Sequence, residues 1–126
     1  FAGRPLHRAF GMRIIDLTLD RCTVEAELNE YTDNGSGTIH GGVIAVLADT
    51  AVAGALATNF DGKMGFATSH LGVHYIRRAK GPVRATATIV KKGSNVCVAR
   101  IDVHDGEGAL VAFASSDYVL TTSRSE

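Results

Sequence analysis

One stretch of the chain decides the fold: Asn34-Gly35-Ser36-Gly37-Thr38-Ile39-His40-Gly41-Gly42, continued by Val43-Ile44-Ala45-Val46-Leu47-Ala48-Asp49-Thr50-Ala51-Val52-Ala53-Gly54-Ala55-Leu56-Ala57-Thr58. The first part is a polar, glycine-rich loop, and the second is rich in alanine and leucine, which favour helix. We therefore expect one long helix from His40 to about Thr58. It is apolar nearly all round, which is typical of a buried helix.

Extended segments are predicted on both sides of this helix. Two precede it, at 12–20 and 21–28, and four follow it, at 65–76, 83–92, 96–104 and 110–121, with short polar turns between them. Segment 21–28 alternates, with apolar residues on one side (Cys22, Val24, Ala26 and Leu28) and polar ones on the other (Thr23, Glu25 and Glu27). A long helix on a curved antiparallel sheet of five to six strands, a fold of the α+β class, satisfies this order.

Such a sheet predicts self-association. One helix can cover only part of one face, and the edge strands of the sheet need protection from uncontrolled pairing. We therefore expect a homodimer, and a homotetramer built as a dimer of dimers stays open.

Composition narrows the class of protein further. The chain has 126 residues, which suits a single domain over 1–126, and its 13 basic and 13 acidic residues cancel. Zero net charge argues against partners such as nucleic acid or a membrane surface. Cys22 and Cys97 show no disulfide or metal spacing and suit reduced core cysteines. The start at Phe1 has no Met and no signal peptide, so we expect a cytoplasmic protein that lacks some upstream residues.

Asp49 is the first candidate for a catalytic residue, because it is the only charged residue between Val43 and Ala57. An ionised carboxylate on a buried helix costs several kcal/mol unless hydrogen bonds replace the lost water. The alternative is an Asp that caps a backbone group or pairs with an arginine, but the neighbouring sequence offers no partner for either role.

Gly41 and Gly42 lie where the helix begins. The first N–H groups of a helix are unpaired and carry partial positive charge, and glycine allows a substrate to approach them closely. Such donors suit the oxyanion that develops on a thioester carbonyl. The alternative is that both glycines only permit a tight turn. His40 could be a base, a ligand or a cap, and Asn34 is common in such loops for turn reasons alone.

The spacing of these candidates constrains the site. Gly41 and Asp49 lie eight residues apart on one helix, a rise of about 12 Å. Both cannot reach the same carbonyl group from one chain. If both act, Asp49 must meet Gly41 of a second subunit, as two antiparallel helices in a symmetric dimer would allow.

The pattern Asn34-x5-His40-Gly41-Gly42-x6-Asp49 resembles the signature of the hotdog-fold thioesterases, in their PaaI-like branch. The strand that runs from Ala67 to Ala79, followed by Gly81, is also similar to that family, although Arg78 stands where many relatives have proline. The resemblance extends from about residue 11 to residue 121. It implies a hotdog fold and an acyl-CoA thioesterase that releases a free acid and CoA without a cofactor.

By this resemblance, Asp49 is implied as general base or nucleophile. The Gly41 N–H would polarise the thioester carbonyl, beside Gly42 as a substrate-binding residue. Asn34 and His40 would orient the substrate, the water or a loop of the opposite subunit. Thr68 would hold the water or the carboxylate.

Basic residues supply candidates for the CoA phosphates. Arg77, Arg78 and Lys80, with Lys91 and Lys92 in the next turn, form the densest local positive charge, although a solvated strand end would look the same. No metal site is expected, because two histidines four residues apart on a strand, as in segment 65–76, lie about 13 Å apart.

Two other functions stay open at this point. A hotdog hydratase or dehydratase is expected to use an Asp and a His at the junction of loop and helix, whereas here Asp33 lies seven residues before His40. A non-catalytic acyl-CoA binding module would keep the groove but would not need Asp49. The identity of the acyl group is not determined by the sequence.

Overall fold

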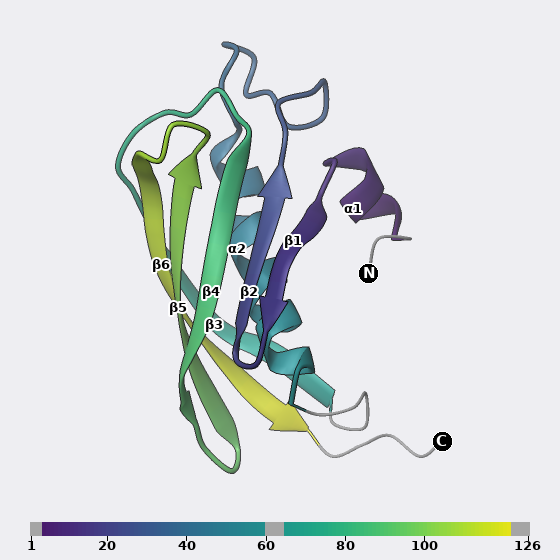
Figure 1. Ribbon diagram of the computed structural model, residues 1–126, viewed down its shortest axis with the longest axis vertical. Coiled ribbons are helices and arrows are strands. Elements are labelled where there is room, and N and C mark those ends of the chain that lie inside the picture. The colour runs from purple at the N-terminus through teal and green to yellow at the C-terminus, as the bar shows by residue number, and fades with distance from the viewer. Residues whose placement is uncertain (1–3, 60–64, 122–126) are drawn as a thin grey trace.

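The computed structural model describes residues 4–59 and 65–121, in which one antiparallel sheet is packed against one long helix (Figure 1). The elements, in chain order, are α1 (Pro5–Ala9), β1 (Arg13–Thr18), β2 (Arg21–Ala26), α2 (Gly41–Ala57), β3 (Gly65–Tyr75), β4 (Val83–Lys92), β5 (Val96–Asp105) and β6 (Leu110–Thr121). The sheet has six strands in the order β1-β2-β4-β5-β6-β3. The expected long helix and curved antiparallel sheet are confirmed.

Helix α2 lies close against the inner face of the sheet because small residues line the contact. Ala48, Ala51 and Ala55 are fully buried beside Leu47 and Leu56, in the same core cluster as the inner side chains of the strands. The approach is so close that a Cβ atom on Gly54 would stand 2.6 Å from the Sγ atom of Cys22 on β2. The close packing fixes the rotation of α2 on the sheet and therefore the direction in which Asp49 points.

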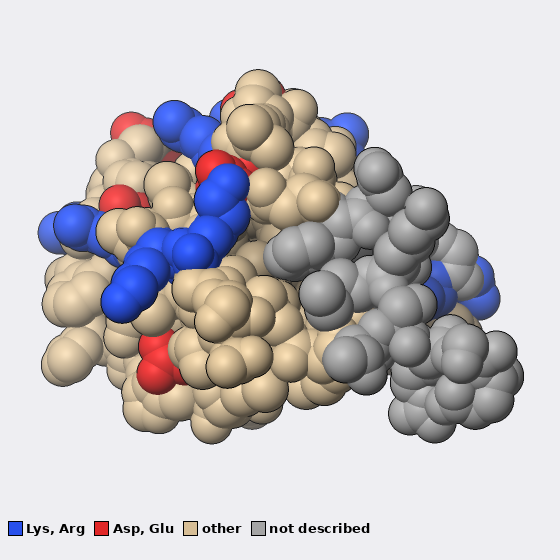
Figure 2. Space-filling view, turned by 90° about the horizontal axis from the view of Figure 1, so that it is seen from below, with Lys and Arg blue, Asp and Glu red and all other residues tan. Residues whose placement is uncertain are grey.

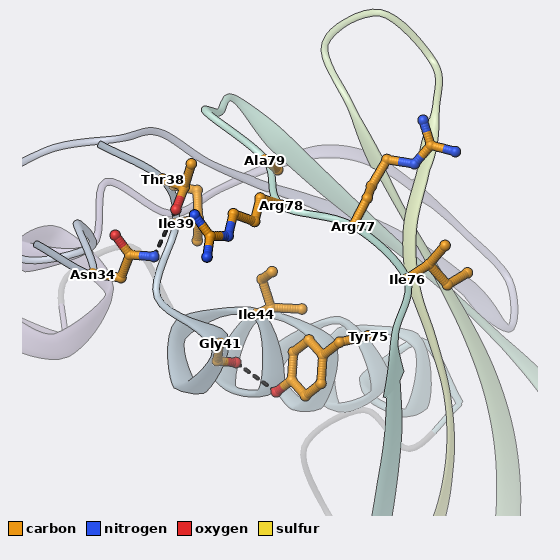
Figure 3. A pocket seen from close by; sticks show the side chains of 10 residues that line it. All are labelled: Asn34, Thr38, Ile39, Gly41, Ile44, Tyr75, Ile76, Arg77, Arg78 and Ala79. Carbon is orange, nitrogen blue, oxygen red and sulfur yellow. Dashed lines mark hydrogen bonds between the residues drawn. The ribbon is translucent and has the colours of Figure 1, made fainter. Parts of the chain in front are cut away.

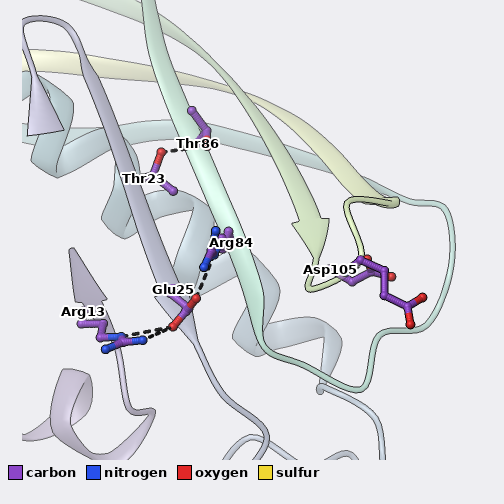
Figure 4. Close-up of polar contacts among 7 residues, drawn as sticks. Arg13, Thr23, Glu25, Arg84, Thr86 and Asp105 are labelled. Atoms are coloured by element: carbon purple, nitrogen blue, oxygen red, sulfur yellow. Dashed lines mark hydrogen bonds and ion pairs between the residues drawn. The ribbon is translucent and has the colours of Figure 1, made fainter. Parts of the chain in front are cut away.

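The polar side of β2 is not open to solvent. Only 2% of Glu25, which lies on this side, is exposed. Its carboxylate is covered by Arg13 of β1, whose Nε and Nη2 atoms lie 3.1 and 2.7 Å from Oε1, and by Arg84 of β4, whose Nε lies 2.8 Å from Oε2 (Figure 4). The alternation of β2 was correct, but its polar side is closed by the neighbouring strands.

This ion pair leads to a pH-dependent prediction. The hydrogen bonds from Arg13 and then Arg84 lower the pKa of Glu25 from its ordinary value of 4.5. A lowered pKa in the folded state contributes stability above pH 4.5, and that contribution is lost as pH falls through the folded-state pKa. Glu25→Gln should therefore reduce the free energy of unfolding by about 1 kcal/mol at pH 7, since both arginines are largely exposed.

Urea unfolding of both proteins at pH 7 and at several values below pH 4.5 measures this difference. The gap between wild type and Glu25→Gln should shrink toward acid pH. A gap that is independent of pH would show that the packing of the side chain matters and its charge does not.

The two edges of the sheet are β1 and β3. Among the described residues, strand β3 pairs only with β6, from Gly65 with Thr121 to Tyr75 with Ala112, and one bulge between Thr68 and His70 interrupts the register. Among residues 4–59 and 65–121, no helix is long and apolar enough to cross a membrane.

Candidate active site

Asp49 lies on the part of α2 that faces β3 and β6, and it is half-buried. The hydroxyl group of Thr68 donates a hydrogen bond of 2.7 Å to its Oδ1 atom. The phenol of Tyr118 donates a short hydrogen bond to the same Oδ1 atom and lies 2.9 Å from the Asp49 carbonyl oxygen. Within the described part of the chain, Oδ2 has no hydrogen-bond partner. One carboxylate oxygen is therefore held and the other is left open.

The sheet explains why two hydroxyl groups meet at one oxygen. Thr68 on β3 and Tyr118 on β6 are directly paired in the register, so their side chains lie side by side on the inner face. The bulge between Thr68 and His70 lies next to this pair. Burial, together with the hydrogen bond to Asp49, raises the pKa of the Tyr118 phenol, so that it stays a protonated donor at neutral pH.

Tyr118 was missed by the sequence analysis. The alternation of 110–121 places it on the same side as Ala112, Ala114 and Ser116, where a large ring with a polar tip is conspicuous. That pattern alone does not identify Asp49 as its partner, because the partner depends on which strand lies beside β6.

The N–H groups of the two glycines at the start of α2 differ in their hydrogen bonding. His40 is the N-cap, and its Nδ1 atom accepts a hydrogen bond of 2.8 Å from the Gly42 N–H. A neutral His40 therefore carries its proton on Nε2. The Gly41 N–H has no partner among residues 4–59 and 65–121. Of the two candidate donors, only Gly41 is free to bind a substrate oxygen, and the N–H of Gly42 is used by the cap.

A groove with a volume of about 340 Å³ opens in front of Gly41 (Figure 3). Ile39, Ile44, Ile76 and Ala79 give it apolar walls. The Tyr75 hydroxyl donates a hydrogen bond of 2.6 Å to the Gly41 carbonyl oxygen, which ties the end of β3 to the first turn of α2. Burial raises the pKa of Tyr75.

Asn34 also lines this groove, but its side chain is engaged within its own loop. Its Nδ2 atom donates to Thr38 Oγ1 at 2.6 Å, and its Oδ1 atom accepts from the Ser36 N–H at 2.8 Å. Asn34 therefore shapes the rim of the groove in this chain. Its expected role in orienting a substrate or a water stays a prediction.

The side chains of the two arginines that follow β3 point in different directions. Figure 3 shows the guanidinium of Arg78 over the groove, between the loop that carries Asn34 and the first turn of α2, whereas Arg77 points away from it. Both side chains are exposed. Arg78 is thus the better placed of the two to meet an anionic part of a ligand.

Lys92 does not belong to this basic cluster, contrary to the sequence expectation. Arg77 is level with Val111 of β6, whereas Lys92 pairs through β5 with Tyr118, about 23 Å further along that strand. Strand β4 runs away from the arginines, and the ammonium group of Lys92 forms an ion pair of 3.0 Å with Asp20 instead. Figure 2 views this end of the molecule, where basic and acidic side chains lie close together on a mostly uncharged surface.

The structure therefore divides the sequence candidates into two groups. Gly41, Asn34 and Arg78 surround the groove at the start of α2, whereas Asp49, with Thr68 of β3 beside it, lies eight residues or about 12 Å further along the helix from Gly41. In the described residues, no group of three or more His, Cys, Asp or Glu side chains could hold a metal ion.

Comparison with known proteins identifies the family of the chain. The family model described as "Thioesterase superfamily" matches residues 36–112, which contain the loop, α2 and most of the sheet. A protein of Saccharolobus solfataricus named "Putative esterase SSO2140" is 31% identical over 113 residues, which cover 88% of this chain and 80% of that protein. A protein of Deinococcus radiodurans named "Putative esterase" is 33% identical over 117 residues, covering 92% of this chain and 76% of the relative.

Solved structures show the same fold. Thioesterase HI1161 from Haemophilus influenzae superposes with a TM-score of 0.90 at 21% identity and covers 96% of this chain and 85% of its own. The E. coli PaaI protein from the phenylacetic acid degradation operon gives a TM-score of 0.86 at 22% identity, covering 96% of this chain and 87% of its own. The chain therefore belongs to the thioesterase superfamily and has the hotdog fold.

Proposed function

We propose that the protein hydrolyses the thioester bond of an acyl-CoA or aryl-acyl-CoA to the free acid and CoA. The observation that carries this proposal is the pair of groups on α2. Within residues 4–59 and 65–121, Asp49 offers a carboxylate oxygen without a hydrogen-bond partner on a helix without other charges, and Gly41 offers an unpaired N–H at the start of the same helix. A base for water and a donor for an oxyanion are the two groups that acyl transfer to water requires.

In the proposed reaction, Asp49 Oδ2 takes a proton from a water molecule while the water oxygen bonds to the thioester carbon. The carbonyl electrons move to the oxygen, which becomes an oxyanion and accepts a hydrogen bond from the Gly41 N–H. When the carbonyl re-forms, the C–S bond breaks and the sulfur leaves as the CoA thiolate, which takes up a proton. Direct attack by Asp49 through an acyl anhydride, which water then hydrolyses, would give the same products.

Both groups can serve one carbonyl only if they come from two copies of the chain. The part of α2 that the sheet leaves uncovered is a stripe of mostly small residues around the acid: Gly42, Ala45, Val46, Asp49, Ala53 and Ala57. Small side chains allow a second helix to approach closely. This stripe supports a homodimer in which two α2 helices lie antiparallel.

Strand β3 supports the same arrangement. Tyr75 is level with Gly41 and Thr68 is level with Asp49, so β3 runs beside α2 in the opposite direction. A two-fold axis that brings Asp49 to the Gly41 of the other copy must pass near Ala45 on the helix. The same axis meets β3 near its centre and would let two copies of this edge strand pair with each other.

A hydratase or dehydratase is less well supported. Such an enzyme is expected to use an Asp close to His40, and Asp33 is the candidate. The Oδ1 atom of Asp33 accepts hydrogen bonds from the N–H groups of Gly35 and Gly37, at 2.7 and 3.0 Å. These contacts hold the Asp33 side chain against the loop of residues 35–37, and no hydrogen bond joins it to His40 among the described residues.

Release of free thiol from a panel of aromatic and aliphatic acyl-CoAs tests the proposal. The same acyl groups on a pantetheine carrier, which lacks the nucleotide, test the role of the groove. Because Arg78 extends over the groove, Arg78→Ala should raise the KM for the CoA thioester about tenfold, the loss expected for one charge-assisted contact to a phosphate. The KM for the pantetheine thioester should stay within about twofold.

Arg77→Ala is the matched control, since this side chain carries the same charge next in sequence but points away from the groove. Equal effects of Arg78→Ala on both substrates would assign Arg78 a structural role. Absence of thiol release from every member of the panel would exclude the proposed activity for those acyl groups and would favour the binding module.

A further inference from the structure

Tyr118 is a buried polar side chain that takes no direct part in the proposed reaction. Only 3% of the residue is exposed, and its ring lies against Phe66 with 5.8 Å between the ring centroids. Its hydroxyl group reaches the Asp49 carboxylate from the sheet, in a short hydrogen bond to Oδ1. Asp49 is itself unusual, as a carboxylate on an apolar helix. The burial of a phenol against it therefore requires a physical explanation.

We infer that Tyr118 is a positioning residue that fixes the Asp49 carboxylate so that Oδ2, and not Oδ1, is the reacting oxygen. The inference rests on the proposed thioester hydrolysis. Both hydroxyl donors, from Thr68 and Tyr118, are directed to Oδ1, and Oδ2 is left without a partner among residues 4–59 and 65–121. Rotation of the carboxyl group by half a turn would only exchange the two oxygens, so the reacting position in space stays fixed.

The two donors differ in how firmly they hold Asp49. The Thr68 hydroxyl lies on an edge strand beside a bulge, on a residue that is itself exposed. Tyr118 lies on the inner face of β6, which is paired with β5 on one side and with β3 on the other. Its phenol also lies 2.9 Å from the Asp49 carbonyl oxygen. It therefore links the side chain and the backbone of Asp49 to a strand that is paired on both sides. A base must stay within hydrogen-bond reach of its proton, so this link should affect the rate.

Tyr118 is not assigned a catalytic role. Its burial keeps the phenol away from a ligand in the groove, and its raised pKa keeps it protonated. The effect on the reaction passes through Asp49. Loss of the phenol should change kcat and its pH dependence and leave substrate binding unaffected.

Tyr118→Phe tests this role, because it removes one oxygen atom and retains the ring contact with Phe66. We expect kcat to fall about 10- to 100-fold, with KM within about twofold of wild type, since one hydrogen bond to a charged group is lost. The acidic limb of the pH–kcat profile should move to higher pH, because a donor that favours the ionised carboxylate is gone. Tyr31→Phe is the matched control, since Tyr31 is largely exposed and lies outside the site.

The outcomes are distinguishable. If Tyr118→Phe keeps the wild-type kcat and pH profile while Asp49→Asn is inactive, the inference is overturned and the proposed function stands. If wild type releases no thiol, the proposed function itself fails. Should Tyr118→Phe be too unstable to assay, 3-fluorotyrosine at position 118 retains the hydrogen bond and makes its donor more acidic. The acidic limb should then move to lower pH, and an unchanged limb would overturn the inference.

Discussion

Replacement of Asp49 by Asn is expected to abolish turnover, with a loss of at least about 100-fold in kcat, while the fold is retained. The amide cannot take a proton from water or form an anhydride, so both versions of the proposed reaction are blocked. The variant should stay folded because Asn has nearly the same size, and an amide oxygen can still accept the hydrogen bonds from Thr68 and Tyr118.

Thiol release at saturating acyl-CoA, together with thermal unfolding of both proteins, measures the two effects separately. Asp117→Asn is the matched control, because Asp117 is a half-buried acid on β6 whose side chain lies on the other face of the sheet from Tyr118. The control should keep wild-type activity. Thioester hydrolysis by Asp49→Asn within a few-fold of wild type would remove Asp49 from the reaction.

The regular elements could be predicted because their signals are local. Segments 83–92 and 110–121 coincide with β4 and β6, since alternation of apolar residues between polar turns depends only on neighbouring residues. The helix expected from His40 to about Thr58 is present as α2 with these two residues as its caps. Asp49 was identified for the same reason, because a single charge in an apolar helix is visible without knowledge of the fold.

The remaining features depend on which strands become neighbours, and the sequence does not contain that order in a local pattern. Glu25 is buried because β1 and β4 lie on either side of β2, and Tyr118 reaches Asp49 because β3 pairs with β6. Lys92 was placed with the arginines by closeness in sequence, although β4 carries it to the opposite end of the sheet. The different roles of the Gly41 and Gly42 N–H groups follow from the hydrogen bond of the His40 cap, which the sequence pattern does not contain.

The composite site predicts that two inactive variants restore activity to each other. Gly41→Pro removes the one N–H that the proposed oxyanion needs, and loss of such a donor costs about 100- to 1,000-fold in kcat. The chain should tolerate it, since Gly41 is the first residue of α2, where proline is favoured, and His40 before it has the extended backbone (φ −61°, ψ 135°) that a following proline requires. Gly41→Ala is the control that retains the N–H, and its Cβ atom would meet the Tyr75 ring at an ordinary 3.5 Å.

Homodimers of Gly41→Pro lack the donor in both sites, and homodimers of Asp49→Asn lack the acid in both. In a mixed dimer, one site collects both substitutions and the other collects neither, because each site would take Gly41 from one copy and Asp49 from the other. Random pairing makes about half of the dimers mixed, each with one intact site of two, so about a quarter of the wild-type activity should return. The two variants are unfolded and refolded together, thiol release is assayed, and native mass spectrometry counts the mixed dimers. If mixed dimers form and the mixture stays as inactive as its parents, Gly41 and Asp49 of different copies do not share a site, and the oxyanion donor must be sought within reach of Asp49 in its own chain.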